Sequence, residues 1–328
     1  MRRIAAVLLV AVLVMAMAVM PAAAQEKKYD IAVIVKATDS DFWQYVLIGA
    51  LNAAVDYPVN VTTYGPPSEV DIEQQIAILE NVITRQPDAI VIASTSSEAS
   101  VPALERAYDQ GIVIITIDNA VRTDKIHSFL ATDNIEAGGK AAEIMVEFLK
   151  ERGLPLNKKV GVISSMAGVQ VLIDRDNGFV NRLRELAPEM EILPIRYVDD
   201  DMLRAMQATE DLLTAHGDDI VGFFADNNLT GDGLARVIDE RGLHDKIVAV
   251  AFDSDPEEIQ ALRTGALDAL ILQDPYNMGY MGVVSAIRAI EGEELPKYVD
   301  TGSTVATKAN MDEPEIVELL DPTLKKKY

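Results

Sequence analysis

The chain has 328 residues and no cysteine, and it carries 52 Asp and Glu against 29 Lys and Arg, a net charge of −23. Such an acidic surface repels phosphate backbones and anionic lipid, which argues against nucleic acid as a partner. The lack of cysteine excludes disulfides and a lipid-bearing cysteine. The length exceeds that of a usual single core and suggests two domains.

The N-terminus has the features of an export signal. Two arginines precede an almost wholly apolar run over residues 4–20, and Pro21 and three alanines follow it. This order predicts a secretory signal peptide over residues 1–24, cleaved near Ala24. A transmembrane anchor is the alternative, but the run is at the short end for a bilayer core, which takes roughly 20 residues. We therefore expect a soluble mature protein in the periplasm.

Continuous apolar runs alternate with amphipathic segments along the first half of the chain. Strands are expected over residues 30–35, 59–64, 89–93 and 112–117, and helices over residues 41–55, 69–85 and 100–110. Apolar strands separated by amphipathic helices predict a parallel sheet covered by helices on both faces.

The same pattern repeats in the second half. Strands are expected over residues 159–163, 191–197, 220–225 and 247–252, and helices over residues 174–186, 205–215 and 229–241. Two strands match closely, because each ends in an aspartate, Asp118 in the first half and Asp253 in the second. The predicted fold is α/β, with two doubly wound parallel-sheet lobes joined by several short crossings.

Polar side chains follow nearly every expected strand, which is where ligands bind in open parallel sheets. The candidates are Lys36, Asp118, Asn119, Asp133, Arg175, Asp200, Asn227, Asp253 and Gln273, with the aromatic pair Phe42 and Trp43. Carboxylates accept hydrogen bonds from hydroxyls, cationic side chains donate, and amides do both, while aromatic rings suit the C–H face of a sugar ring. The set predicts a site for a polyhydroxylated ligand. Turn formation and helix capping favour the same residue types and remain the alternative at each single position, and Trp43 could be a core residue.

These residues resemble the type I periplasmic sugar-binding proteins of the ribose, allose and galactose group, from about Tyr29 to about Thr307. The resemblance is carried by segments 36–43, 117–119, 132–139, 174–179, 225–228, 251–253 and 272–273. It implies the solute-binding component of an ABC importer, which captures a monosaccharide or a related polyol or amino sugar by hinge closure. It implies no enzyme activity, no cofactor and no metal. The implied partners of this monomer are a sugar-like ligand, an ABC permease and ATPase complex, and a chemoreceptor or sensor kinase.

The resemblance also implies roles for individual residues. Phe42 and Trp43 are expected to sandwich the sugar ring. Hydrogen bonds to its hydroxyls are expected from Asp118, Arg175, Asn227, Asp253 and Gln273. Lys36 stands where allose-type members place a ligand-contacting lysine, while Asn119 replaces an arginine and Asp200 an aromatic residue of the ribose-type members. Both differences argue against ribose and make the pocket more acidic. The turn over residues 65–69 resembles that of the autoinducer-type members, so a furanosyl ligand of that type remains an alternative.

The resemblance places hinge crossings near residues 132–133, 273–274 and 301–303. It divides the chain into a first lobe and a second lobe. The first comprises residues 29–132 plus 274–302, and the second comprises residues 133–273 plus 303–328. The lysines at 325–327 are expected to form a solvated end.

The sequence bears on three other classes of protein. An enzyme is disfavoured, because His127, His216 and His244 are scattered and no nucleophile elbow or phosphate-binding loop is present. Residues 226–231 resemble a calcium loop, but Val237 takes the place of the required glutamate. The predicted signal peptide and the lack of a basic helix-turn-helix argue against a transcription repressor. A sugar sensor, which presents its ligand to a membrane kinase and takes no part in transport, would have the same sequence features as a transport protein.

Overall fold

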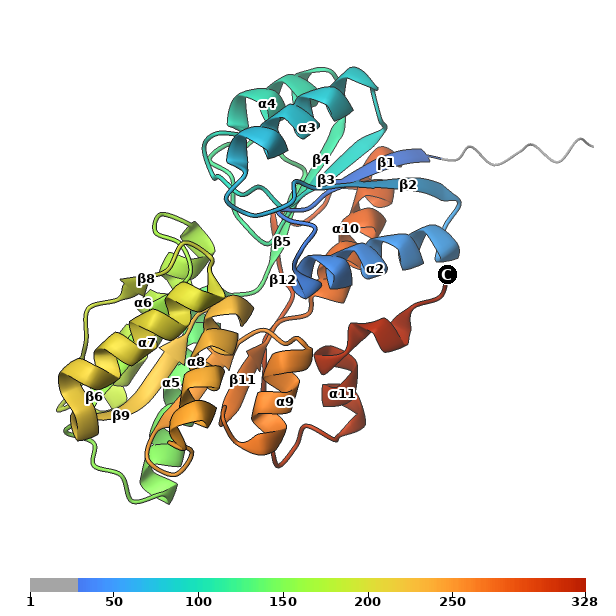
Figure 1. The fold of residues 1–328 in the computed structure, drawn as a ribbon. Coiled ribbons are helices and arrows are strands. Elements are labelled where there is room, and N and C mark those ends of the chain that lie inside the picture. The colour runs from blue at the N-terminus through green and yellow to red at the C-terminus, as the bar shows by residue number, and fades with distance from the viewer. Residues whose placement is uncertain (1–28) are drawn as a thin grey trace, which may run out of the picture.

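The computed structural model describes residues 29–328, and the predicted signal peptide lies outside the described residues. The described chain forms two α/β lobes, and Figure 1 shows each lobe with its own sheet and helices and the chain crossing between them. This confirms the predicted fold class. Within residues 29–328, no helix is long and apolar enough to cross a membrane.

The first lobe is built on a six-stranded sheet in the order β12-β5-β4-β3-β1-β2. Its strands are β1 (Tyr29–Ile34), β2 (Val59–Tyr64), β3 (Ala89–Ile92), β4 (Val113–Ile117), β5 (Ser128–Ala131) and β12 (Tyr298–Asp300). All neighbours in this sheet pair in parallel. The central strand β3 is buried along its whole length, as expected where helices cover both faces.

Four helices cover the first sheet. They are α2 (Asp41–Asp56) and α10 (Pro275–Ile290) on one face, and α3 (Ile72–Thr84) and α4 (Val101–Asp109) on the other. Val46 and Met278 belong to the apolar cluster under the first helix pair, and Leu79 and Leu104 to the cluster under the second. The segment from residues 275–290 therefore completes a lobe that is otherwise built from the N-terminal part of the chain.

The second lobe is built on a seven-stranded sheet in the order β13-β11-β10-β9-β6-β7, with β8 also paired to β6. Its strands are β6 (Lys159–Ser164), β7 (Glu191–Ile192), β8 (Arg196–Tyr197), β9 (Ile220–Ala225), β10 (Val248–Phe252), β11 (Ala269–Leu272) and β13 (Thr304–Thr307). The strand β13 runs antiparallel to β11 at one edge, whereas the other pairs are parallel.

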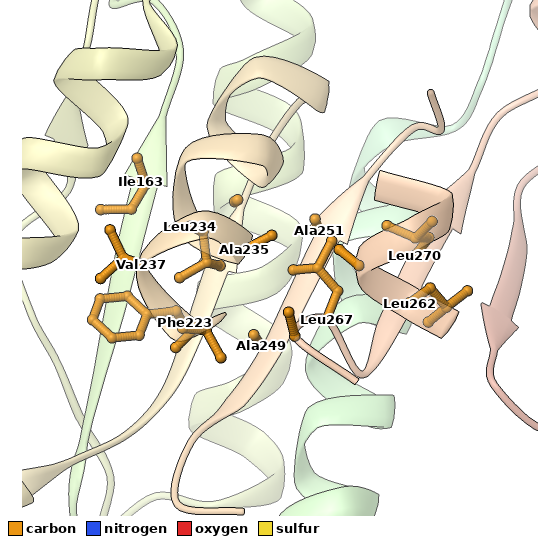
Figure 2. Close-up of a cluster of buried hydrophobic side chains, with 14 of the residues drawn as sticks. Ile163, Phe223, Leu234, Ala235, Val237, Ala249, Ala251, Leu262, Leu267 and Leu270 are labelled. Atoms are coloured by element: carbon orange, nitrogen blue, oxygen red, sulfur yellow. The ribbon is translucent and has the colours of Figure 1, made fainter. Parts of the chain in front are cut away.

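Helices cover both faces of this sheet as well. They are α5 (Asn134–Glu151) and α6 (Gln170–Leu186) on one face, and α7 (Met202–His216), α8 (Asn228–Arg241), α9 (Pro256–Thr264) and α11 (Pro314–Leu320) on the other, with a short 3-10 turn η1 (Gly217–Asp219) before β9. Figure 2 shows part of the apolar cluster on the face covered by α7, α8, α9 and α11. In this cluster, Phe223 and Leu270 of the strands pack with Leu234 and Leu262 of the helices.

Three element boundaries differ from the sequence prediction. Helix α3 begins at Ile72, so Glu69 stays in the preceding loop. Helix α6 begins at Gln170, one turn before the predicted start at residue 174, and the Gln170 amide donates to Asp174 Oδ1 at 2.8 Å. The predicted strand over residues 191–197 is two short pieces, β7 and β8, which pair with separate stretches of β6.

The chain crosses between the lobes at the three predicted places, which confirms the three-segment hinge. The crossings lie between β5 and α5, between β11 and α10, and between β12 and β13. The first and the third crossing are bonded to each other, since Thr132 Oγ1 donates to Gly302 O at 3.2 Å and the Asp133 N–H donates to Asp300 Oδ1 at 3.1 Å.

The end of the chain makes a further contact between the lobes. Helix α11 packs in the second lobe, and the 3-10 turn η2 (Pro322–Lys325) then lies against α2 of the first lobe, where Figure 1 marks the C-terminus. The buried Asn52 side chain donates to Lys325 O at 2.7 Å and accepts from the Lys327 N–H at 3.0 Å. The Lys327 ammonium lies 2.5 Å from Asp56. The expected solvated end is therefore bound to the first lobe.

Candidate ligand-binding cleft

A cleft lies between the lobes at the carboxyl ends of the strands of both sheets. It encloses about 410 Å³ of empty space when the open solvent at its mouth is counted. Its lining comprises Lys36, Ser40, Phe42, Trp43, Glu69 and Asp118 of the first lobe, Ser165, Val169, Val171, Leu172, Arg175, Asn227, Asn228 and Asp253 of the second, and Gln273 at a crossing.

Most of the residues predicted to bind ligand come together here. They are Lys36, Phe42, Trp43, Asp118, Arg175, Asn227, Asp253 and Gln273. They are widely separated in sequence and meet because parallel strands end at one edge of each sheet. Their contacts with a ligand stay a prediction.

Lys36 and Asp118 form a buried ion pair on the first-lobe side. The Lys36 ammonium lies 2.5 Å from Asp118 Oδ2, with side chains only 3% and 4% exposed. Asp118 adopts a left-handed φ of +63°, and its N–H donates to Leu130 O at 2.9 Å, one position beyond strand β4. Asp is among the few residues other than glycine that tolerate this conformation. The pair presents a donor and an acceptor already fixed in place.

Asp253 and Gln273 form the matching pair on the second-lobe side. Asp253 also has a left-handed φ, +77°, and Gln273 Nε2 donates to its Oδ1 at 2.6 Å. Burial raises the pKa of Asp253, and the Arg175 charge and the bond from Gln273 act in the opposite direction. Gln273 Oε1 is buried without a partner in the described chain, so it is free to accept a bond from a ligand.

Arg175 lies inside helix α6 and is held from three directions. Its Nε donates to Asn134 Oδ1 at 2.9 Å, its Nη1 donates to Asp226 O at 2.8 Å, and its guanidinium lies 4.3 Å from the Phe252 ring. Nη1 also lies 3.9 Å from Asp253 Oδ2. The guanidinium is therefore oriented before any ligand arrives, which limits the entropy lost on binding.

Close packing of α5 against α6 places Arg175. A Cβ at Gly138 of α5 would lie 2.1 Å from Arg175 O, and one at Gly178 of α6 would lie 2.1 Å from Ile135 O. Only glycine permits this approach of the two backbones. The first lobe repeats the arrangement, since a Cβ at Gly49 of α2 would lie 1.9 Å from Tyr276 O of α10.

The aromatic pair does not form the predicted sandwich. The Phe42 and Trp43 rings are perpendicular to each other, with centroids 4.8 Å apart at 82°. A sugar ring between them would need roughly 7 Å, twice a van der Waals contact of about 3.5 Å. A sandwich would require the two rings to face each other across a gap. Successive residues of a helix such as α2 point in different directions, so Phe42 and Trp43 do not face each other. The two rings line one side of the cleft, and Val171 and Leu172 line it from the other lobe.

Glu69 lines the cleft but was not among the predicted site residues. Its Oε1 accepts a 2.6 Å hydrogen bond from Trp43 Nε1. Burial raises the pKa of Glu69 to about 7, the Lys36 charge and the Trp43 bond lower it, and the carboxylates of Asp200 and Asp118 raise it. Trp43 is the only tryptophan of the chain, and a buried indole N–H usually has a hydrogen-bond acceptor. That requirement is the one feature of the sequence that could have indicated an acidic residue near Trp43.

Three predicted site residues do not line the cleft. Asn119 is buried behind Asp118, and its amide donates to Ser94 O at 3.0 Å. Asp133 caps helix α5 by accepting from the Glu136 N–H at 3.0 Å, so at this position helix capping, the alternative to ligand binding, accounts for the aspartate. Asp200 accepts from Ser165 Oγ at 2.7 Å and from Asn227 Nδ2 at 2.9 Å, and so supports two lining residues.

The early start of α6 explains why three further lining residues were not predicted. Val169, Val171 and Leu172 lie at the beginning of this helix, in a segment expected to be loop.

Within residues 29–328, no group of three His, Cys, Asp or Glu side chains is placed to hold a metal ion.

The fold and the cleft together define a class of protein that binds a small polar solute between two hinged lobes. Oriented donors and acceptors come from both lobes, and the crossings allow the lobes to close around the solute. The chain belongs to the periplasmic binding protein domain family, whose model matches residues 31–294.

Relatives and solved structures agree with this assignment. The chain is 27% identical over 265 residues to a ribose import binding protein of Haemophilus influenzae, covering 81% of this chain and 87% of that one. It is 24% identical over 273 residues to a D-allose-binding periplasmic protein of Escherichia coli, covering 81% and 86%. A carbohydrate transporter solute-binding protein of Agrobacterium radiobacter, solved with D-arabinose, matches with a TM-score of 0.86 and 35% identity over 90% of this chain and 100% of that one. One from Agrobacterium vitis, solved with D-fucose, matches with a TM-score of 0.82 and 34% identity over 89% and 100%.

Proposed function

We propose that this protein is the periplasmic solute-binding component of an ABC importer and that it captures a monosaccharide, or a related polyol or amino sugar, by closing its lobes. The observation that carries the proposal is the pairing of oriented polar groups across the cleft. Asp118 and Lys36 come from one lobe, and Asp253 and Arg175 from the other. Solved relatives that bind D-arabinose and D-fucose support a sugar of that size.

The chemistry of the lining suits a ring with several hydroxyls. Carboxylates of Asp118 and Asp253 accept hydrogen bonds from hydroxyls, and Arg175, Asn227 and Gln273 donate to oxygen atoms. The Phe42 and Trp43 rings offer an apolar wall for a C–H face of the sugar. Specificity is expected to be sharp, because a ligand that lacks one hydroxyl leaves a buried polar group without a partner.

Closure is the proposed mechanism of capture. We assign residues 29–132 plus 274–302 to the lobe that carries Lys36 and Asp118, and residues 133–273 plus 303–328 to the lobe that carries Arg175 and Asp253. The ligand favours the closed form by the hydrogen bonds that it makes to both lobes at once. The closed form would then be the one that the membrane permease recognises.

Export, assembly and the absence of catalysis belong to the same proposal. The mature chain would begin after Ala24, once the signal peptide over residues 1–24 is removed, and would act as a monomer. It would release its ligand unchanged to the permease, and a chemoreceptor or sensor kinase could read the same closed form. N-terminal sequencing of periplasmic protein and recovery of intact sugar after incubation test these points.

A thermal-shift screen tests the proposed ligand class. Residues 25–328 are screened with pentoses, hexoses, 6-deoxyhexoses, polyols, amino sugars and amino acids. A sugar is expected to raise the melting temperature by an amount that grows with its concentration. Arg175→Lys is expected to lose the shift, because lysine cannot reproduce the forked contacts, whereas Arg182→Lys on the exposed side of the same helix should keep it. A response to amino acids alone would refute the sugar assignment.

A further inference from the structure

Glu69 is the one acidic group of the cleft lining that no cation neutralises directly. Lys36 pairs with Asp118, and Arg175 lies against Asp253. Within residues 29–328, Glu69 forms no ion pair, and its one hydrogen bond is the 2.6 Å contact from Trp43 Nε1 to Oε1. Its other oxygen, Oε2, is left without a hydrogen-bond partner although the residue lines the cleft.

We propose that Glu69 is a ligand-binding and specificity-determining residue, whose Oε2 accepts a hydrogen bond from a donor substituent of the bound sugar, a hydroxyl or a protonated amine. The inference rests on the proposed function and adds a residue and a selection rule to it. Trp43 occupies Oε1, and the residue lines the cleft, so Oε2 is the oxygen that remains to accept from a ligand. Ligands that present a donor there are selected over those that present an acceptor or hydrogen.

The charges around Glu69 explain why a donor is needed. Lys36 after β1 and the Trp43 N–H of α2 stabilise its carboxylate, while Asp118 after β4 and Asp200 before α7 oppose it. Asp200 belongs to the opposite lobe, where Ser165 and Asn227 hold it. Asp39 of the first lobe also has its pKa raised, by burial and then by the Asp200 charge. Closure therefore brings carboxylates of the two lobes toward each other, and a donor substituent offsets part of that repulsion.

A supporting role for Trp43 is the competing explanation. In that case Glu69 serves only as the acceptor for the indole N–H. Glu69→Gln separates the two roles, since the glutamine Oε1 still accepts from Trp43 but its amide presents a donor where the carboxylate presented an acceptor. A structural role predicts no change in affinity, whereas ligand contact predicts a loss of about 10- to 100-fold.

The protonation of Glu69 supplies a second readout. Its pKa in the free protein is raised to about 7, and a donor substituent favours the ionised form. Binding should therefore release a proton, and affinity should rise as the pH increases from 6 to 8. In Glu69→Gln this pH dependence should be absent.

Titration calorimetry tests the inference with the best sugar from the screen. Wild type, Glu69→Gln and the exposed control Glu73→Gln are compared at pH 6 and pH 8, with the parent sugar, its monodeoxy analogues and its amino analogues. We expect wild type and Glu73→Gln to agree and Glu69→Gln to lose about 10- to 100-fold against the parent. The loss should vanish for the one deoxy analogue that lacks the recognised hydroxyl, and a tighter amino analogue at that position would assign the donor to an amine.

The outcomes separate this inference from the function on which it rests. Wild type that binds sugar while Glu69→Gln binds equally at both pH values overturns the inference alone. Affinity that falls as the pH rises would also overturn it, since Glu69 would then act as a donor. Wild type that binds no sugar overturns the proposed function and the inference together. Emission from Trp43, the only tryptophan, checks that Glu69→Gln retains the native cleft.

Discussion

Asp118 and Asp253 occupy equivalent positions in the two lobes. Each follows a central strand with a left-handed φ, +63° and +77°, and each donates its N–H to a carbonyl of the neighbouring strand, Leu130 O at 2.9 Å and Ile271 O at 3.0 Å. Both carboxylates line the cleft, and each faces a cation. Two copies of one local structure therefore provide acceptors from opposite sides of the ligand.

Neutralising Asp253 should abolish tight binding without unfolding the protein. Asparagine at this position still offers an oxygen to the Gln273 amide. It lacks the negative charge that attracts Arg175 and strengthens a hydrogen bond from a ligand hydroxyl. We expect the affinity to fall by about 10- to 100-fold, since hydrogen bonds to charged groups are worth about 1.5–3 kcal/mol. The melting temperature of the free protein should stay the same or rise, because burial raises the pKa of Asp253 and so disfavours its charged form. Calorimetric affinity and thermal melting of Asp253→Asn, with the exposed Asp245→Asn as control, check both points.

Two adjacent glycines of α5 should respond in opposite ways to alanine. Gly138→Ala would place a methyl group against Arg175 O, where overpacking costs about 1–3 kcal/mol and displaces the arginine. Gly139→Ala meets no atom closer than 3.9 Å and should stabilise the helix by about 0.5–1 kcal/mol. Urea unfolding and sugar affinity are measured for both variants. Equal behaviour of the two would contradict the close α5–α6 packing.

The end of the chain should limit how far the two lobes open. Asn52 of the first lobe bonds to the backbone at Lys325 and Lys327, while α11, just before them, packs in the second lobe. Asn52→Ala leaves these backbone groups without their partner and should cost about 1–3 kcal/mol. We expect a larger radius of gyration for the free protein by small-angle X-ray scattering and a severalfold weaker affinity. Lys326→Ala, at an exposed position, is the control, and an unchanged radius in Asn52→Ala would argue against a restraining tail.

Stability should decrease as the pH rises toward 8, because of a buried acidic group in the second lobe. Burial, with the carboxylates of Asp255 and Glu257, raises the pKa of Asp232 to about 8. A raised pKa means that its contribution is complete below pH 3.8 and is lost as the pH rises through about 8. Asp232→Asn should be more stable than wild type at pH 8 by on the order of 2 kcal/mol, and the difference should shrink at pH 5. Denaturant unfolding at both pH values, with Asp239→Asn on the same helix as control, measures it.

Much of this structure could be predicted from the sequence, and the exceptions have common physical causes. The apolar strands predict both sheets, and the ends of parallel strands bring Lys36, Asp118 and Asp253 to one cleft. Strand order does not determine which way a side chain turns after its strand. Asp200 therefore bonds to Ser165 and Asn227 and is not itself a lining residue of the cleft.

Tertiary contacts account for the other differences. The perpendicular Phe42 and Trp43 rings depend on the packing of α2, and the cleft position of Glu69 depends on where α3 begins. The sequence predicts a solvated final turn, because its partner Asn52 lies 273 residues away in the chain and no local pattern indicates the contact.

Fluorescence of Trp43 during a sugar titration tests the central claim most directly, because this is the only tryptophan and it lines the cleft. For residues 25–328, we predict that one sugar class changes the emission saturably with one molecule bound per chain, and that Asp253→Asn shifts the midpoint to a sugar concentration about 10- to 100-fold higher. Emission unaffected by every pentose, hexose, polyol and amino sugar, or a sugar that binds tightly without altering it, would contradict a sugar site between the lobes.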